Sequence, residues 1–348
     1  MKKKIIARAI VVSALLMLNS CAANTDKDNT EVIADDKKTS GSVFAMDTYM
    51  TVTAYGDNGK KGIEAAQKEI TRLEKLWSVT DENSEIYAIY HSGGAEVSIS
   101  AETEELLDFA IDMHSRTNGA LDITLYPVLR AWGFTTGEYR VPDDDEISSL
   151  LECKGVDRIK AGDGKASVPE NTEIDLGAIA KGSAGDAAAK ALKEQGVTSD
   201  LLDLGGNIQT VGDSKPDGTK WKVGIRDPFG EGSIGTLTIG ECAVITSGGY
   251  ERFFEKDGLI YKHILDPETG RPAESGLASV TIIGNEGRTC DALSTSLYVM
   301  GLDDACGYWR ENHDFDMILV NDKGVVYVTE GISESFSPNV DDVTVVER

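Results

Sequence analysis

Apolar residues recur every three to four positions in several long segments, which is the spacing of an amphipathic helix. One apolar face runs through Ile63, Ala66, Ile70, Leu73 and Trp77. A second helix is predicted after Ser100, a good N-cap residue, and ends near Gly119. Further helices are predicted in the segments "PDDDEISSLLE", "AKGSAGDAAAKALKEQG" and "CDALSTSLYVMG".

Shorter segments between these helices alternate apolar and polar residues or are rich in Val, Ile and Thr, as β-strands are. "GSVFAMDTYMTVTAYG" is predicted as one strand, "NTEID" as a strand that leads into a helix, and "DMILVNDKGVVYVTEG" as a hairpin. Other predicted strands are "WKVGIRDP" and "ASVTIIG". Because helices and hairpins alternate irregularly, the pattern favours an α+β fold with mixed, largely antiparallel sheets over a doubly wound parallel sheet.

The first 20 residues combine a basic start with an apolar stretch that is short for a membrane span, which is typical of an export signal. "LNSC" at 18–21 is similar to a bacterial lipobox, so we expect cleavage before Cys21 and lipidation of that cysteine. The alternative is an ordinary signal peptide followed by an unrelated cysteine. Residues 21–41 are poor in apolar side chains and predicted to be a disordered tether. The folded domain is then expected at 42–346, anchored to the cell membrane on its extracytoplasmic side.

The net charge and the spacing of the cysteines argue against several classes of function. The net charge of −25 argues against binding to nucleic acid and against peripheral binding to anionic lipid. The cysteines after the signal have neither CxxC nor zinc spacing, so we expect small buried side chains, and the sequence leaves their pairing open. There is no Walker A, GxGxxG or GxSxG motif. These four cysteines are Cys153, Cys242, Cys290 and Cys306.

Three short motifs suggest a ligand cleft. In "DLGAIAKGSAGD", Asp175 and small residues precede a predicted helix, whose free N–H groups suit phosphate, and Lys181 adds positive charge. The alternative is a closely packed turn. "DLGGNI" and "TSGGY" place glycine pairs at strand ends. Each pair alone is typical of a turn or bulge, but two of them favour a cleft lined by backbone.

Asp291 and Thr295 lie four residues apart in "CDALST" and therefore on one face of a predicted helix. A carboxylate and a hydroxyl are hard oxygen ligands that suit Mg²⁺. Two side chains are too few for a closed site, so phosphate oxygens or a backbone carbonyl would have to complete it. The alternative is an ordinary helix start with an acid in its first turn.

Together these segments resemble the FAD:protein FMN transferases of the ApbE family. The resemblance covers nearly the whole chain after the tether and rests on seven motifs in order: "MDTYMTV", "NGALDITL", "DLGAIAKG", "DLGGNI", "TSGGYERFF", "HILDPETGRP" and "DALSTSLYVMG". It implies a T-fold-like architecture with the FAD site in a cleft between two interleaved halves. It also implies Mg²⁺-dependent cleavage of FAD, release of AMP, and attachment of FMN to a Thr or Ser of a target flavoprotein.

The resemblance assigns site residues as well. The expected FAD contacts are Met46, Ala120, Leu121, Asp122 and Asp175, with Lys181 and Leu265 at further positions. The expected Mg²⁺ ligands are the backbone carbonyl of Ala178 and the side chains of Asp291 and Thr295. "MDT" stands where "MGT" is commoner in the family, so Asp47 leaves the backbone conformation beside the flavin open.

His263 is the only one of the four histidines that lies inside a matching motif, "HILDPETGRP". Proton transfer near neutral pH suits a histidine, so His263 is the expected catalytic group, as acid or as base. The alternative is a structural histidine that bonds to the turn.

Two rival functions remain at this point: an FAD pyrophosphatase with water as the acceptor, which gives FMN and AMP, and a non-catalytic flavin-binding surface lipoprotein. The combination of Asp291, Thr295 and His263 argues against the latter. The partner implied by the resemblance is an exported or membrane flavoprotein.

Overall fold

The computed structural model describes residues 32–33 and 37–348. The predicted signal, Cys21 and most of the predicted tether lie outside the described residues. The helices of the described part are α1 Gly59–Trp77, α2 Glu85–Tyr90, α3 Ala101–Arg116, α4 Tyr126–Trp132, α5 Asp144–Leu151, α6 Ala180–Glu194, α7 Gly287–Met300, α8 Leu302–Glu311 and α9 Glu330–Ser333, with a 3₁₀ turn at Val156–Arg158. Among these helices, none has the length and apolar character needed to cross a membrane.

One large sheet organises the described part of the chain, in the order β1-β2-β3-β7-β8-β11-β14-β15-β16-β18. Each neighbouring pair in it is antiparallel except β16 and β18. The predicted α+β class with largely antiparallel sheets is therefore confirmed. The bounds are β1 Val32–Ile33, β2 Lys38–Ala45, β3 Thr48–Ala54, β7 Asp200–Asp203, β8 Ile208–Val211, β11 Ala243–Gly248, β14 Leu277–Gly284, β15 Phe315–Asn321, β16 Val326–Thr329 and β18 Val343–Val346.

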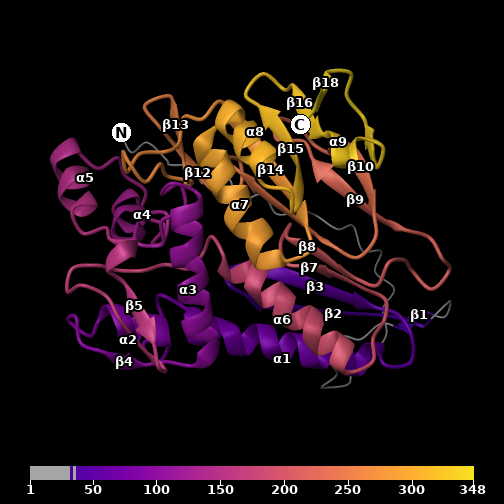
Figure 1. Cartoon of the computed structure of the whole chain (residues 1–348), viewed down its shortest axis with the longest axis horizontal. Coiled ribbons are helices and arrows are strands. Elements are labelled where there is room, and N and C mark those ends of the chain that lie inside the picture. Colours follow the sequence, from indigo (N-terminus) through magenta and orange to yellow (C-terminus); the bar gives the residue numbers. More distant parts are fainter. Residues whose placement is uncertain (1–31, 34–36) are drawn as a thin grey trace, which may run out of the picture.

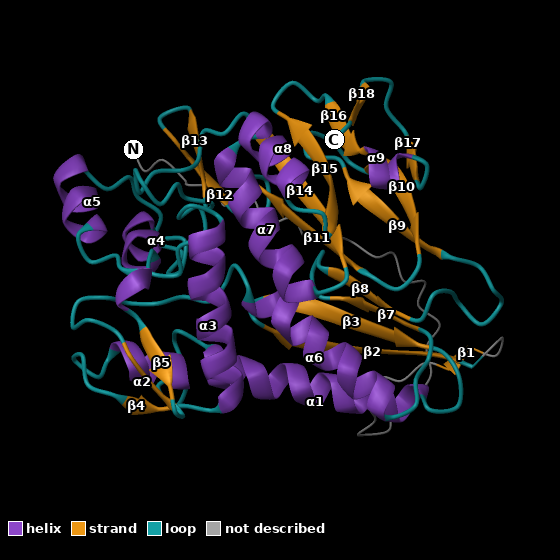
Figure 2. Cartoon of the chain, in the orientation of Figure 1, coloured by secondary structure: helices purple, strands orange, loops and turns teal. Residues whose placement is uncertain are grey.

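Smaller sheets flank the large one: β4-β6-β5, β17-β10-β9 and the hairpin β12-β13. The helices α1, α6 and α7 lie side by side over one face of the large sheet (Figures 1 and 2). The strands β9, β10 and β17 cover part of its other face, where Trp221 and Leu237 pack against Ile318 and Val328. The bounds are β4 Val97–Ser98, β5 Lys160–Gly162, β6 Lys165–Ser167, β9 Trp221–Arg226, β10 Ser233–Ile239, β12 Phe253–Lys256, β13 Leu259–Lys262 and β17 Phe336–Pro338.

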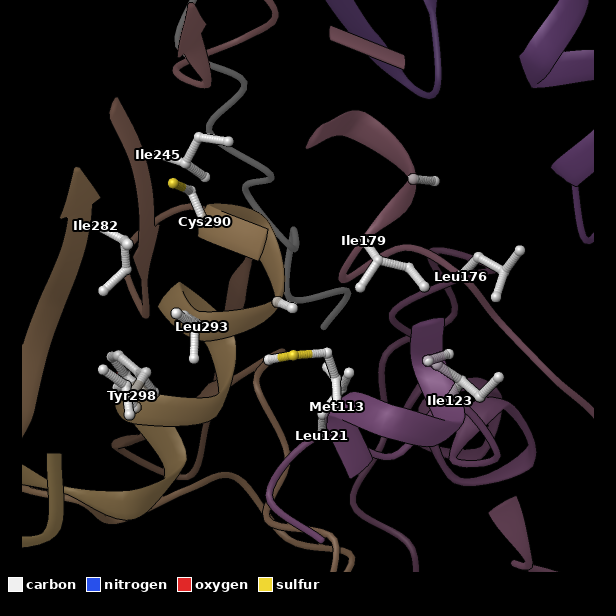
Figure 3. Packing of buried hydrophobic residues seen from close by; sticks show 14 of the residues in the cluster. Met113, Leu121, Ile123, Leu176, Ile179, Ile245, Ile282, Cys290, Leu293 and Tyr298 are labelled. Carbon is white, nitrogen blue, oxygen red and sulfur yellow. The ribbon is translucent and has the colours of Figure 1, made fainter. Parts of the chain in front are cut away.

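The main core joins segments that are far apart in the sequence. Met113 of α3 and Leu121 lie between α7, with Leu293 and Tyr298, and the segment that carries Ile179 (Figure 3). The core therefore fixes α7 relative to the loops that precede α4 and α6. Both loops carry predicted site residues.

The predicted helices are confirmed. On α1 the side chains of Ile63, Ala66, Ile70, Leu73 and Trp77 are buried. Ser100 caps α3 through its side chain, which accepts a hydrogen bond from the Thr103 N–H. Asp143 caps α5 in the same way. Periodicity and capping chemistry are local properties, so the sequence carries them directly.

Three predictions about the strands and the tether are wrong. The predicted single strand at 42–55 is the hairpin of β2 and β3, because Met46 and Asp47 both adopt the left-handed conformation and reverse the chain. β1 and the start of β2 lie within the predicted tether, so residues 32–33 and 38–41 belong to the sheet and not to a disordered tether. Residues 171–175 form no strand and run into α6 as irregular chain.

The four cysteines of the described part are free thiols. Cys290 and Cys306 are buried, as predicted, whereas Cys153 and Cys242 are only half-buried.

Candidate active site

A cleft of about 1220 Å³ opens beside α7 and is lined by segments between Phe44 and Thr295. The structure brings all the predicted site residues of the domain to its wall. They are Met46, Ala120, Leu121, Asp122, Asp175, Ala178, Lys181, His263, Leu265, Asp291 and Thr295. Cys21, the predicted lipidation site, lies outside the described residues.

Met46 and Asp47 form the tight turn between β2 and β3 at the edge of the cleft. Their φ angles are 50° and 59°, a region where glycine is preferred and aspartate is tolerated. The Met46 N–H donates to Glu74 Oε1 at 2.7 Å, and Arg252 Nη2 donates to Asp47 Oδ2 at 2.6 Å. The aspartate therefore keeps the left-handed turn and adds an ion pair across the cleft edge.

The Ala120–Asp122 loop is held from behind by α3. The Leu121 N–H donates to Thr117 Oγ1 at 3.1 Å, and His114 Nδ1 donates to the Leu121 carbonyl at 2.7 Å. Asp122 has a side chain that is only 2% exposed, and its carboxylate accepts hydrogen bonds from Thr124 and lies 3.6 Å from Lys154 Nζ. Its carboxylate is thus engaged within the protein and fixes the shape of the cleft wall.

Asp175 stands on the wall just before α6. Its N–H donates to the Ile123 carbonyl at 2.8 Å, and its Oδ1 accepts from the Gly177 N–H at 2.8 Å. Burial raises the pKa of this carboxyl, while the Gly177 N–H and the charges of Lys181 and Arg252 oppose the shift. Lys181, in the first turn of α6, lines the same cleft.

Asp291 projects from α7 and is 4% exposed. Its Oδ2 accepts from the Gly182 N–H of α6 at 2.8 Å, and its Oδ1 accepts from Asn207 Nδ2 at 3.1 Å. Burial raises the pKa of Asp291, and the Lys181 charge, the Gly182 N–H and the Asn207 amide oppose the shift. One of the N–H groups in the first turn of α6 therefore donates its hydrogen bond to Asp291.

Thr295 lies one helical turn further along α7, with its Oγ1 3.1 Å from Ser247 Oγ of β11. Asp291, Thr295 and Ala178 line one cleft and offer a carboxylate, a hydroxyl and a backbone carbonyl, the hard oxygen donors that Mg²⁺ takes. No group of three or more His, Cys, Asp or Glu in the described residues could hold a metal ion. The donors fit a magnesium ion that phosphate oxygens would complete, and not a closed protein site.

His263 follows β13 at the wall of the cleft. Its backbone N–H and its ring Nδ1 both lie within bonding distance of the Arg252 carbonyl, at 3.0 Å and 3.1 Å. Because a carbonyl only accepts, Nδ1 carries the hydrogen and Nε2 keeps its lone pair. Burial lowers the pKa of His263 to about 4; the hydrogen bond to the Arg252 carbonyl opposes the shift, and the positive charges of Arg252 and Lys181 add to it. The ring is therefore neutral at pH 7 and suited to act as a base.

The turn after His263 is rigid. The Asp266 N–H donates to the Arg271 carbonyl, and the Gly270 N–H donates back to the Asp266 carbonyl, both at 2.8 Å. Trp132 Nε1 donates to the Gly270 carbonyl at 2.9 Å. Leu265, 4% exposed, packs in the cluster around Trp132. These contacts fix the strand end that carries the histidine.

Sequence reasoning missed three cleft residues. Arg252 supplies the carbonyl that orients His263, whereas Asn207 and Ser247 contact Asp291 and Thr295. The glycine pairs beside Asn207 and Ser247 were the available signal. Their partners on α7 are distant in sequence, so spacing could not reveal them.

Comparisons with known proteins agree with this arrangement. The family model described as "ApbE family" matches residues 46–319. A Klebsiella pneumoniae protein named FAD:protein FMN transferase is 32% identical over 77% of this chain and 85% of its own length. A Vibrio cholerae protein of the same name is 31% identical over 94% of this chain and 97% of its own.

Solved structures give the same result. The ApbE protein of Thermotoga maritima has a TM-score of 0.81 at 32% identity and covers 86% of this chain and 99% of its own. The flavinyl transferase ApbE of Pseudomonas stutzeri has a TM-score of 0.78 at 28% identity, covering 88% and 98%. With the matched family model and the shared fold, this chain belongs to the ApbE family.

Proposed function

We propose that this protein transfers FMN from FAD to the hydroxyl of a Thr or Ser on a target flavoprotein and releases AMP. The observation that carries the proposal is the orientation of His263. Its Nδ1–H is bound to the Arg252 carbonyl, so Nε2 is free to accept a proton, in the cleft that also holds Asp291 and Thr295. Relatives named FAD:protein FMN transferase support the substrate and the protein acceptor.

In the proposed reaction the acceptor oxygen attacks the phosphorus on the FMN side of the FAD pyrophosphate. The new bond is a phosphoester between that oxygen and FMN, and the bond that breaks is the P–O bond to AMP. The hydroxyl proton goes to Nε2 of His263, and the electrons of the broken bond leave with the AMP phosphate. The imidazole is neutral at pH 7 because its pKa lies well below 7, so the Nε2 lone pair is available for this proton.

Asp291, Thr295 and the Ala178 carbonyl are the proposed Mg²⁺ ligands in this cleft. Bound Mg²⁺ would supply positive charge that neutralises the pyrophosphate and stabilises the leaving AMP. Lys181 adds a second positive charge on the same wall. The Gly182 N–H and the Asn207 amide keep Asp291 oriented before substrate arrives.

Incubation with FAD, Mg²⁺ and a Thr-containing target tests the proposal. We expect AMP to appear in step with a mass increase on the target that corresponds to FMN. AMP without a modified target would support an FAD pyrophosphatase instead. Tight binding of FAD without any AMP would support a flavin-binding lipoprotein.

We also propose that the domain is lipid-anchored through Cys21 at the extracytoplasmic face of the cell membrane. The export signal and lipobox-like "LNSC" support this location. Cys21→Ala should release an active domain into the soluble fraction, because about ten residues separate Cys21 from β1 and keep the anchor outside the folded domain. If the variant stays with the membrane at wild-type level, the apolar N-terminus is itself the anchor.

A further inference from the structure

Two polar side chains from neighbouring strands contact the two α7 residues that face the cleft. Asn207 directly precedes β8, and Ser247 lies near the end of β11, which pairs with β8. Asn207 reaches Asp291, and Ser247 reaches Thr295, at 3.1 Å in both cases. The two strand ends that carry the glycine pairs therefore both contact the same face of α7.

Asn207 and Gly182 hold the Asp291 carboxylate from two sides. The Asn207 side chain, in a residue that is 4% exposed, donates to Oδ1, and the Gly182 N–H donates to Oδ2. Each oxygen keeps a further lone pair, because a carboxylate oxygen accepts two hydrogen bonds. Both donors fix the plane of the carboxylate and leave it able to bind a cation from the cleft.

The hydroxyl groups around Thr295 fit one continuous direction of hydrogen bonding. Ser294 Oγ donates to the Asp291 carbonyl at 2.9 Å, so it accepts from Ser247 Oγ at 2.8 Å. Ser247 has then used its hydrogen and accepts from Thr295 Oγ1 at 3.1 Å. In this direction Thr295 donates its hydrogen to Ser247, and its oxygen lone pairs stay free for a cation.

We infer that Asn207 and Ser247 are positioning residues, which hold Asp291 and Thr295 in the orientation that binds a divalent cation. This inference deepens the proposed function and rests on it. The site therefore depends on the packing of α7 on β11 and on the contact between Asp291 and Asn207 at the start of β8. Both residues act through the ligands and have no role in proton transfer.

Binding of Mn²⁺ to protein saturated with ADP, followed by electron paramagnetic resonance, tests this inference without turnover. Mn²⁺ takes the same oxygen ligands as Mg²⁺, and ADP supplies a diphosphate. We expect Asn207→Ala and Ser247→Ala to weaken Mn²⁺ binding roughly tenfold or more, which is typical for removal of a group that orients a metal ligand. Asp291→Ala should abolish binding.

Matched controls separate positioning from general destabilisation. Thr210→Val removes a buried hydroxyl of β8 that bonds to Gly240 and Cys242, and Ser296→Ala removes a buried hydroxyl of α7 that bonds to Ala292. Both should keep wild-type Mn²⁺ affinity even if they lower the melting temperature. An equal loss of affinity in the controls would overturn the inference.

The results of the Mn²⁺ experiment can be told apart from a failure of the proposed FMN transfer. Mn²⁺ affinity within twofold of wild type in both Asn207→Ala and Ser247→Ala would refute positioning, whether or not FMN transfer occurs. Weakened binding in the variants alone would support positioning, even if no target became flavinylated. If Asn207→Ala does not fold, Ser247→Ala decides, because it removes a single oxygen atom.

Discussion

At the residue scale, the direction of one hydrogen bond determines what His263 can do. The Arg252 carbonyl takes the Nδ1 hydrogen, and burial, aided by the adjacent positive charges, keeps the ring neutral. A histidine with only a structural role would also bond to the backbone. Such a role does not require the ring to lie in a cleft lined by Lys181 and Asp291. The ring thus favours a general base over an acid.

His263→Ala should therefore bind FAD nearly as well as wild type but release AMP about 10²–10⁴-fold more slowly, which is the usual contribution of general acid–base catalysis. Stopped-time assays of AMP at saturating FAD and acceptor measure this. The exposed His313 provides the control, since His313→Ala should leave the rate unchanged. Normal turnover at saturation in a less stable protein would show that His263 is structural.

The pH dependence gives an independent check on His263. A base with a pKa of about 4 is active above that pH and is lost as pH falls through it. The acidic limb of kcat/KM should therefore lie near pH 4 and not near 6.5, within the range where the protein stays folded. Asp175 and Asp291 also line the cleft and have raised pKa values, so His263→Ala must remove the limb for it to be assigned to the ring. A limb near 6.5 would contradict the lowered pKa.

Only part of the candidate site follows from local sequence chemistry, whereas positions such as Met46, Ala120 and Leu265 rest on the resemblance to the ApbE family. Asp291 and Thr295 share a helix face through their spacing alone. The contacts of Asn207 and Ser247 could not be predicted, because they join residues 84 and 48 positions apart. Likewise, Arg252 orients His263 through its backbone carbonyl, a contact that residue type does not reveal.

At the element scale, the approach of α6 to α7 sets the site. A Cβ on Gly182 would lie 2.3 Å from the Gly287 carbonyl oxygen and 2.8 Å from Asp291 Cβ. On α6, Asp186 accepts hydrogen bonds from the Gly287 and Arg288 N–H groups at the start of α7. The two helices are therefore joined both by close contact and by capping.

Gly182→Ala should lower stability by about 1–3 kcal/mol, since the added methyl group forces two backbones apart. It should also weaken Mn²⁺ binding, because it displaces Asp291. Gly307→Ala on α8 is the matched control: its Cβ would meet nothing within 4 Å, so alanine should stabilise the helix by up to about 1 kcal/mol. Urea denaturation of both variants measures the difference. Equal stability changes would show that the α6–α7 contact is not tight.

Helices were predicted more accurately than strands for a physical reason. The apolar face of α1 and the caps of α3 and α5 are encoded within single segments. The reversal at Met46 and Asp47 lacks glycine, proline or asparagine, so the sequence signalled one strand where the chain forms two. Strand order needs contacts across the whole chain, such as β3 with β7 and β8 with β11.

At the scale of the whole molecule, the large sheet contains a buried acid whose charged form has no partner in the described part of the chain. Asp200 on β7 is 0% exposed, and neither of its carboxylate oxygens has a hydrogen-bond partner in the described part of the chain. It pairs in register with Ala54 and Val211, which belong to the core cluster beneath α1 and α6. Burial raises the pKa of Asp200 to about 8.

This raised pKa predicts a loss of stability as pH rises. Above its ordinary pKa of 3.8, Asp200 is ionised in the unfolded chain but still protonated in the folded one. Folding then requires proton uptake, which reduces the free energy of unfolding by up to about 1.4 kcal/mol per pH unit until about pH 8. Urea denaturation between pH 6.5 and 8.5 measures the slope above the pKa of Asp186, which is raised to about 6 and would add a slope of the same sign at lower pH.

Asp200→Asn removes the titrating group while keeping the shape of the side chain. Its unfolding free energy should be nearly independent of pH across this window, whereas wild type should lose about 2 kcal/mol. Glu194→Gln, at the exposed end of α6, should retain the wild-type slope. The decisive quantity is the slope and not the absolute stability, because the new amide must itself be buried. If wild type and Asp200→Asn show the same slope, Asp200 is ionised in the folded protein, and the chain must supply a partner for its charge.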